Sequence, residues 1–192
     1  MSAIANLLSA FGLSTAAGLN AYLPLLVVGL LGRYTNLIHL SQPFDALSHP
    51  IVLLIVAVLA LLDFVGDKIP AVDHTLHAVG LVVAPIAGAI LFMATSGGDG
   101  SVNPLLAAIS GVIIAGGTHS ARATARPLAT VSTAGIANPI ISFFEDVVSL
   151  VLSLLAILVP VLAFLLVIFF AILMFMLLRR VWGRRRGGSS TP

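Results

Sequence analysis

Charged residues are scarce in this sequence. Lys, Arg, Asp and Glu make up 8% of the 192 residues, while 59% are hydrophobic and the mean hydropathy is +1.16. Soluble domains carry about 25% charged residues. The composition therefore predicts an integral membrane protein, and the length leaves no room for an additional soluble catalytic domain.

Cysteine is absent, which excludes disulfides and thiolate metal sites. Covalent catalysis would have to use Ser, Thr, Lys or a carboxylate. The features of a cleavable signal peptide are missing too, because the N-terminal MSAIANLL has no basic residue and the apolar stretch continues past Gly29. We therefore expect the first apolar segment to remain in the membrane as a helix.

The few positive charges are unevenly distributed. Of the nine Lys and Arg residues, five follow the last apolar run: Arg179, Arg180, Arg184, Arg185 and Arg186. Such a cluster marks the cytoplasmic end of a membrane helix and favours contact with anionic lipid headgroups over nucleic acid. We expect residues 181–192 to form a basic, disordered cytoplasmic tail.

Apolar runs of about 20 residues predict membrane-spanning helices. Four runs fit one pass each, at about residues 3–31, 50–69, 75–94 and 104–120. The run from Pro139 to Leu178 is too long for one pass, and Pro160 divides it because proline removes a helical hydrogen bond. The sequence thus predicts an all-α polytopic bundle of about six transmembrane helices in a single domain, residues 1–180. An even number of passes places both termini in the cytoplasm.

Two of these runs contain glycine close to a polar residue. Gly18 and Asn20 interrupt the first run, and Gly117 and His119 stand at a similar depth in the fourth. Aligning the two motifs divides the chain into inverted halves of three passes, about residues 1–95 and 102–180. Transporters with inverted repeats place broken helices and their binding sites near the bilayer midplane. We therefore expect broken first and fourth helices. One feature disagrees with the inversion: the acidic residues at 63–67 and at 145–146 fall on the same side of the membrane, whereas inverted halves would place them on opposite sides.

Acidic residues are concentrated in or beside the predicted helices. Five of the seven lie there: Asp63, Asp67, Asp73, Glu145 and Asp146. Ionisable groups inside a membrane are costly unless paired or hydrated, and they mark ion or substrate pathways. Asp63 and Asp67, four residues apart, share one helix face and need a bound cation, a shared proton or a positive neighbour.

Lys68, Arg122 and Arg126 are the candidate positive neighbours. The two arginines are also explained as an interfacial pair that obeys the positive-inside rule. The residues expected along a polar pathway are Asn20, Asp63, Asp67, Lys68, His119, Arg122, Arg126, Glu145 and Asp146.

A second polar group, Asp73, His74 and His77, follows the second predicted helix. Asp73 with His77, or His74 with His77, has a spacing compatible with metal binding. The sequence fixes no third ligand, and Asp73 is also explained as a helix N-cap. The presence of a metal ion is therefore left open, and no cofactor is predicted.

Five short motifs stand together in this chain: GLNAY (18–22), DKIPAVD (67–73), PIAGAIL (85–91), GTHSARATAR (117–126) and SFFEDV (142–147). With them the chain resembles, over about residues 13–150, the domain of unknown function 4126 family of small bacterial membrane proteins. The resemblance implies a membrane fold in the bacterial inner membrane, but no activity. The chain departs from the family at residues 132–139, and at His77, Gly80 and Ala84, where the family tends to carry an acid, a histidine and an arginine.

Transport is the function that these features favour. We expect a small transporter or channel-like protein for an ion or small polar solute, with proton coupling through His119, because histidine changes charge near neutral pH. Two other functions stay open: an accessory membrane subunit with a buried salt-bridge network, and an intramembrane lipid enzyme using residues from Asp67 to His77 as acid and base. A water-filled cavity at His119 would favour transport. A dry salt-bridge network would favour the accessory subunit, and an opening toward the lipid would favour the enzyme. So short a chain forms a narrow bundle, and we expect a homo-oligomer.

Overall fold

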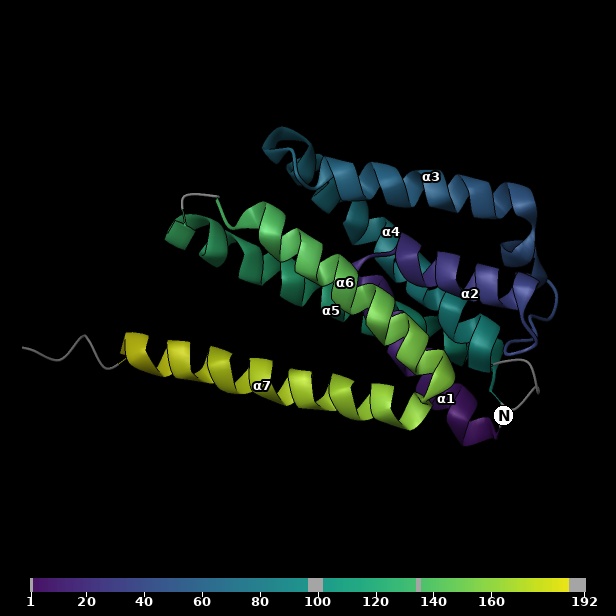
Figure 1. Ribbon diagram of the computed structural model, residues 1–192. Helices are drawn as coiled ribbons and strands as arrows, with labels where there is room; N and C mark the ends of the chain where they lie inside the picture. The colour runs from purple at the N-terminus through teal and green to yellow at the C-terminus, as the bar shows by residue number, and fades with distance from the viewer. Residues whose placement is uncertain (1, 97–101, 134–135, 187–192) are drawn as a thin grey trace, which may run out of the picture.

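The computed structural model describes residues 2–96, 102–133 and 136–186, except for the side chains at 70–74, 77, 127–132, 174, 177, 178 and 180–186. The described chain is all-α, with seven α-helices, one 3-10 helix and no strand (Figure 1). In chain order these are α1 (Ala3–Leu19), α2 (Tyr22–Tyr34), η1 (Phe44–Ser48), α3 (Pro50–Gly66), α4 (Pro70–Ser96), α5 (Pro104–Thr133), α6 (Asn138–Leu158) and α7 (Pro160–Arg186).

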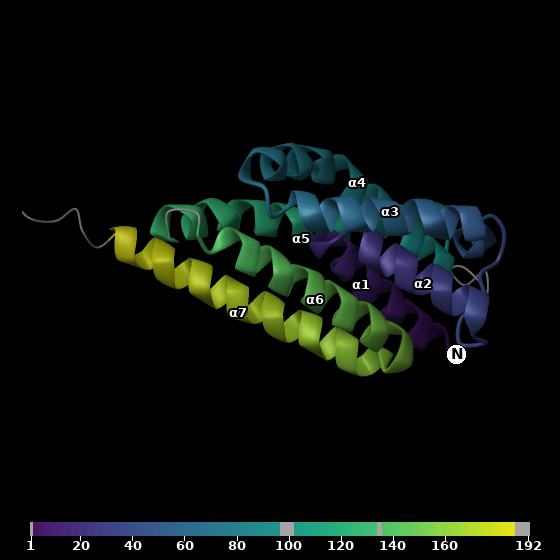
Figure 2. The same ribbon diagram turned by 45° about the horizontal axis from the view of Figure 1, so that its top comes forward.

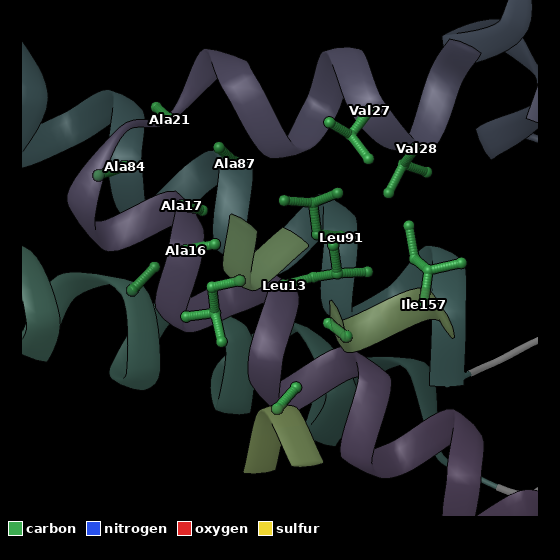
Figure 3. Packing of buried hydrophobic residues seen from close by; sticks show 14 residues of the cluster. Leu13, Ala16, Ala17, Ala21, Val27, Val28, Ala84, Ala87, Leu91 and Ile157 are labelled. Carbon is green, nitrogen blue, oxygen red and sulfur yellow. The ribbon is translucent and has the colours of Figure 1, made fainter. Parts of the chain in front are cut away.

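Helices α1 and α2 form a hairpin that turns back inside the bundle. Their link at Asn20 lies in the middle of the molecule, and their outer ends lie at the same end of it (Figures 1 and 2). At that end the Phe11 ring of α1 packs 5.5 Å from the Phe92 ring of α4, and Val28 of α2 belongs to one buried cluster with Ile157 of α6 (Figure 3). The predicted first pass is therefore two short helices that enter and leave on the same side.

The hairpin turns at Asn20 because this residue ends one helix and caps the next. Its backbone is extended, with φ −142° and ψ 120°, which stops α1. Its side-chain oxygen accepts hydrogen bonds from the N–H groups of Tyr22 at 2.9 Å and Leu23 at 3.1 Å, which caps the start of α2. Pro24 follows in the first turn, where a missing N–H costs little.

Helices α3 to α7 run between the two ends of the bundle (Figure 1). Three described segments are long and apolar enough to cross a membrane: Ala78–Ser96, Pro104–Arg126 and Asn138–Leu158. Shorter apolar helices accompany them: Ala3–Leu19, Tyr22–Tyr34, Pro50–Gly66 and Pro160–Leu173. The predicted division at Pro160 is confirmed, since α6 ends at Leu158 and α7 begins at Pro160. The chain is a helical membrane protein.

The two ends of the described chain lie at opposite ends of the bundle (Figure 1). The prediction of both termini in the cytoplasm counted the first apolar run as a full crossing, whereas the hairpin returns to its own end of the bundle. The side of the membrane on which each terminus lies stays a prediction. Helix α7 also continues through Arg186. Residues 181–186 are thus helical and not a disordered tail as predicted, and residues 187–192 lie outside the described part.

Helix α5 is unbroken from Pro104 to Thr133, so the prediction of a broken fourth helix at Gly117 and His119 is wrong. A helical glycine costs about 1 kcal/mol relative to alanine, but α4 packs closely along α5 and offsets that loss. The two motifs aligned as repeats instead touch each other. A Cβ on Gly18 of α1 would lie 2.6 Å from the carbonyl oxygen of Ala115 in α5.

Small residues let α1 lie at the centre of the bundle, against α4, α5, α6 and α7. Its inner face includes Ala10, Ala16 and Ala17, which are fully buried, and the Ser14 hydroxyl donates to the Gly88 carbonyl of α4 at 3.0 Å. Close helix approach through small residues is typical of membrane helices. This packing holds the polar link of the hairpin at the centre of the protein.

Helix α3 lies at the edge of the bundle (Figure 1), and many of its large apolar side chains are exposed. The exposed ones are Ile51, Leu54, Ile55, Val58, Leu59, Leu61, Leu62 and Val65. Such a surface suits lipid tails, since water would not solvate it. The polar residues Asp63 and Asp67 lie away from this apolar surface, near the C-terminal end of α3.

We predict that Gly18→Ala lowers the thermal unfolding temperature, because the added methyl group meets the backbone of α5. Overpacking of this kind costs about 1–3 kcal/mol. Gly117→Ala is the matched control, since nothing lies within 4 Å of the added carbon and the helix gains up to about 1 kcal/mol. Thermal unfolding in detergent, followed by circular dichroism, measures both. Equal unfolding temperatures for the two variants would contradict the close contact.

Candidate functional site

Most of the residues predicted for the polar pathway come together around the hairpin link. Asn20 lies in the link. The other residues come from the C-terminal end of α3, the middle of α5 and the first turns of α6. The predicted residues that share hydrogen bonds, ion pairs or a cavity there are Asn20, Asp63, Asp67, His119, Arg122, Arg126, Glu145 and Asp146. The link and three helices that are distant in sequence thus contribute to one polar centre.

The side chain of Asn20 joins three elements. Its oxygen is committed to the N–H groups that open α2, so its nitrogen faces the other way. That nitrogen donates to Asp63 Oδ2 at 3.0 Å and to Asp146 Oδ1 at 2.9 Å. One amide therefore ties the hairpin to α3 and α6, and its orientation is fixed by the backbone of α2.

The guanidinium of Arg122 reaches three acceptors. Nε donates to Glu145 Oε2 at 2.7 Å, Nη1 to the Leu19 carbonyl oxygen at 2.7 Å, and Nη2 to Asp67 Oδ2 at 3.0 Å. The Leu19 carbonyl belongs to the last turn of α1, where the helix dipole is negative. A positive side chain from α5 thus stabilises the end of α1, while Asn20 stabilises the start of α2.

Arg126, one turn further along α5, contacts the same two carboxylates. Its Nη2 lies 2.7 Å from Glu145 Oε2 and 3.4 Å from Asp67 Oδ2. The Ser142 hydroxyl of α6 adds a third donor to Asp67 Oδ2, at 2.7 Å. Asp67 and Arg126 are 5% and 6% exposed. A buried pair of this kind is tolerable because both partners are paired and hydrogen-bonded.

The polar centre carries more negative than positive charge. The network of Arg122, Arg126, Asp67 and Glu145 is formally neutral. Asp63 and Asp146 add two further carboxylates, and in the described part of the chain no cationic group lies within 4.0 Å of either. Asp146 is 6% exposed, and its Oδ2 is buried with no hydrogen-bond partner.

Lys68 does not provide the missing charge, although the sequence named it as a candidate neighbour. Its Nζ donates to the Phe64 carbonyl at 2.6 Å and lies 3.2 Å from the centroid of the Phe64 ring. The ammonium is therefore held against the last turn of α3, which it follows in the chain, and makes no ion pair with Asp63 or Asp67. This cation–π contact replaces the salt bridge expected from sequence proximity.

A small cavity lies against the hairpin link. Its volume is about 30 Å³, which is enough for about two water molecules. Its polar wall consists of Asn20, Tyr22, Asp63, Asp67, His119 and Arg122. Asp63, Tyr22 and Arg122 in this wall are partly exposed.

Gly80 of α4 makes room for the buried His119. A Cβ at Gly80 would lie 2.5 Å from His119 Cε1, and Gly80 and Ala84 both line the cavity. These are two of the positions at which the chain departs from the resemblance described above. Their small size leaves the cavity open beside the histidine ring.

The second polar group predicted from the sequence is only partly visible. Asp73, His74 and His77 lie on α4, but their side chains fall outside the described residues. Among the side chains that are described, no group of three His, Asp or Glu residues is placed to hold a metal ion.

Two serines of α6 and the backbone acceptor at Leu19 also belong to the polar centre and were not predicted from the sequence. Ser149 donates to the Ala16 carbonyl at 3.0 Å, and Ser142 binds Asp67. A signal was present, because Ser142, Asp146 and Ser149 recur at helical spacing within an apolar helix, which marks a buried polar face.

We predict that Asp67→Asn is strongly destabilising and Asp63→Asn is not. Asp67 faces two guanidinium groups, so its neutralisation leaves buried positive charge, at a cost of about 3–5 kcal/mol. No described cationic side chain lies within 4.0 Å of Asp63, and its bond from Asn20 survives in the amide, so we expect a change within about 1 kcal/mol. Thermal unfolding of both variants in detergent measures the difference. A loss at Asp63 as large as that at Asp67 would refute the charge distribution described here.

Comparison with known proteins agrees with the motifs singled out in the sequence. No curated protein and no solved structure matches the chain. A family model described as Domain of unknown function (DUF4126) matches residues 7–180. Because this match covers most of the 192 residues, the chain belongs to the DUF4126 family, as its motifs predicted.

Proposed function

We propose that this protein is a membrane transport protein that moves a small cation past the link of the α1–α2 hairpin. The observation that carries the proposal is the cavity that reaches His119 beside an excess of negative charge. A buried negative site with access to water attracts cations and disfavours anions. The cavity is too small for a larger polar solute. Of the two kinds of cargo expected from the sequence, an ion or a small polar solute, we therefore propose the ion.

The re-entrant hairpin supports this function. Non-helical backbone at membrane depth is tolerated only where it is buried in protein or lines a water-filled cavity. Here the break at Asn20 borders the cavity, with the negative end of α1 and the positive end of α2 meeting at its wall. Secondary transporters use interrupted helices near the midplane in the same way.

The charge distribution supports one orientation in the membrane. The C-terminal ends of α3, α5 and α7 lie toward one end of the bundle, and the C-terminal end of α2 lies at the other (Figure 1). Lys68 follows α3, Arg126 and Arg179 belong to the later parts of α5 and α7, and Arg33 stands in the last turn of α2. Positive charge is retained on the cytoplasmic side. We infer that the end of α7 is cytoplasmic, beside anionic lipid headgroups, and that the start of α1 faces the opposite side of the bacterial inner membrane. The homo-oligomer expected from so short a chain is part of this proposal.

An accessory membrane subunit is the second candidate. The interlocked contacts of Arg122 and Arg126 with Asp67 and Glu145 favour it, because such a network fixes helices rigidly. A purely structural network, however, has no need of the unpaired carboxylates of Asp63 and Asp146. The lipid-enzyme alternative has less support, since Asp67 is occupied by three donors.

We predict that the purified protein in liposomes conducts a small cation and that Asp63→Asn reduces the flux to that of empty liposomes, because the cavity then loses its exposed negative group. His119→Ala should also change the flux. The measurement compares H⁺, Na⁺ and K⁺ fluxes with fluorescent indicators trapped inside the liposomes.

Asp45→Asn is the matched control, because Asp45 lies in η1, away from the cavity, and is exposed. It should conduct as the wild type does. Absence of flux for all three ions, or equal flux in wild type, Asp63→Asn and His119→Ala, rejects transport and leaves the accessory subunit as the better candidate.

A further inference from the structure

Asp63 and Asp146 form a pair that no described cationic side chain contacts within 4.0 Å. Both accept from the same Asn20 nitrogen, at 3.0 and 2.9 Å, so their bound oxygens are no more than 5.9 Å apart. They come from different helices, α3 and α6, and neither belongs to the arginine network. Two like charges held this close inside a membrane repel each other strongly.

The surroundings of the pair offer little compensation. Tyr22 approaches from α2, Asp67 from α3 itself, and His119 and Arg122 from α5, while α4 adds small or apolar residues to the described cavity wall. Arg122 and Arg126 are bound to Asp67 and Glu145. One Asn20 amide thus faces two formal negative charges, and a buried charge without a partner usually binds a proton instead.

The geometry excludes a metal ion between the two carboxylates. The space there holds the amide nitrogen of Asn20, which presents its hydrogens to both oxygens. The amide cannot turn its oxygen inward, because that oxygen is held by two N–H groups of α2. A metal ion needs several oxygen ligands around it, whereas a proton needs a single free oxygen. Asp146 Oδ2, buried and without a partner, is such an oxygen.

We propose that Asp63 and Asp146, bridged by the amide of Asn20, hold one exchangeable proton, and that the cation the protein moves or couples to is H⁺. The claim about transport rests on the proposed function, whereas the claim about the bound proton does not. Uptake takes a proton from cavity water onto one carboxylate, so the formal charge of the pair changes from −2 to −1. Release returns that proton to water.

Proton exchange at this pair also changes how α3 is held. A charged acceptor makes a hydrogen bond about twice as strong as a neutral one. Protonation of Asp63 therefore weakens its bond to Asn20, which is the side-chain hydrogen bond described between α3 and the hairpin. Asp63 lines the cavity and is partly exposed, so it is the member of the pair that water reaches first.

Infrared difference spectroscopy of the full-length protein tests the bound proton without any transport assay. We expect a carboxylic-acid C=O band in the wild type at neutral pH that shifts in D₂O and disappears at high pH. The band should be lost in Asp63→Asn or in Asp146→Asn and retained in the exposed control, Asp45→Asn. If Asp146→Asn fails to fold, the wild-type spectrum and Asp63→Asn still decide the outcome.

Three results overturn the proposal: no such band in the wild type, a band that persists in both pair variants, or a band that added Na⁺ removes at constant pH. The last result would identify a metal-cation site. A bound proton in a protein without flux would reject the proposed transport function and leave the proton site standing. Flux without the band would reject the proton site alone.

Discussion

The structure depends on the side chain of Asn20. Its oxygen caps α2, and its nitrogen binds carboxylates on α3 and α6, so one amide both makes the chain turn and fixes where the turn lies. Backbone N–H groups at a helix start are costly to leave unpaired in a membrane. The hairpin can therefore stop halfway through the bundle only because this residue, with Arg122 at the Leu19 carbonyl, satisfies both helix ends.

Around this link the ionisable groups divide into two sets with different properties. The arginine network is balanced and immobile, since each member has partners that hold its geometry. The Asp63–Asp146 pair is unbalanced and held by a neutral group. The first set gives the site its shape, and the second gives it a charge that can change. Because the two sets are adjacent, the charge on Asp63 or Asp146 can change while the backbone groups at the end of α1 and the start of α2 keep their hydrogen bonds.

Much of the fold followed from hydropathy, because the few polar residues separate the apolar runs clearly. The division at Pro160 and the interruption near Asn20 were both predictable. The direction of the chain after Asn20 was not, since α1 and α2 together have the length of a single pass and periodicity does not show a reversal. The fourth helix was misjudged for a related reason: glycine lowers helix stability, but the packing of α4 that offsets it involves distant residues such as Gly88 and Gly111.

The residues that form the site could be predicted from the sequence, but the contacts between them could not. Scarcity of charge made Asp63, Asp67, Glu145 and Asp146 conspicuous, whereas sequence proximity favoured Lys68 as a counter-ion. Lys68 binds the Phe64 carbonyl and ring instead. The partners of the carboxylates come from α1 and α5, and contacts between helices so far apart in the chain leave no periodic signal.

The hairpin has a consequence for how the protein is made. The turn is synthesised before its partners: Asp63 follows Asn20 by 43 residues and Asp146 follows it by 126, while Arg122 follows Leu19 by 103. Until α5 and α6 are in place, Asn20 has its partners on α2 and α3 but lacks Asp146, and the Leu19 carbonyl lacks Arg122. The turn is therefore complete only after these later helices have packed against it.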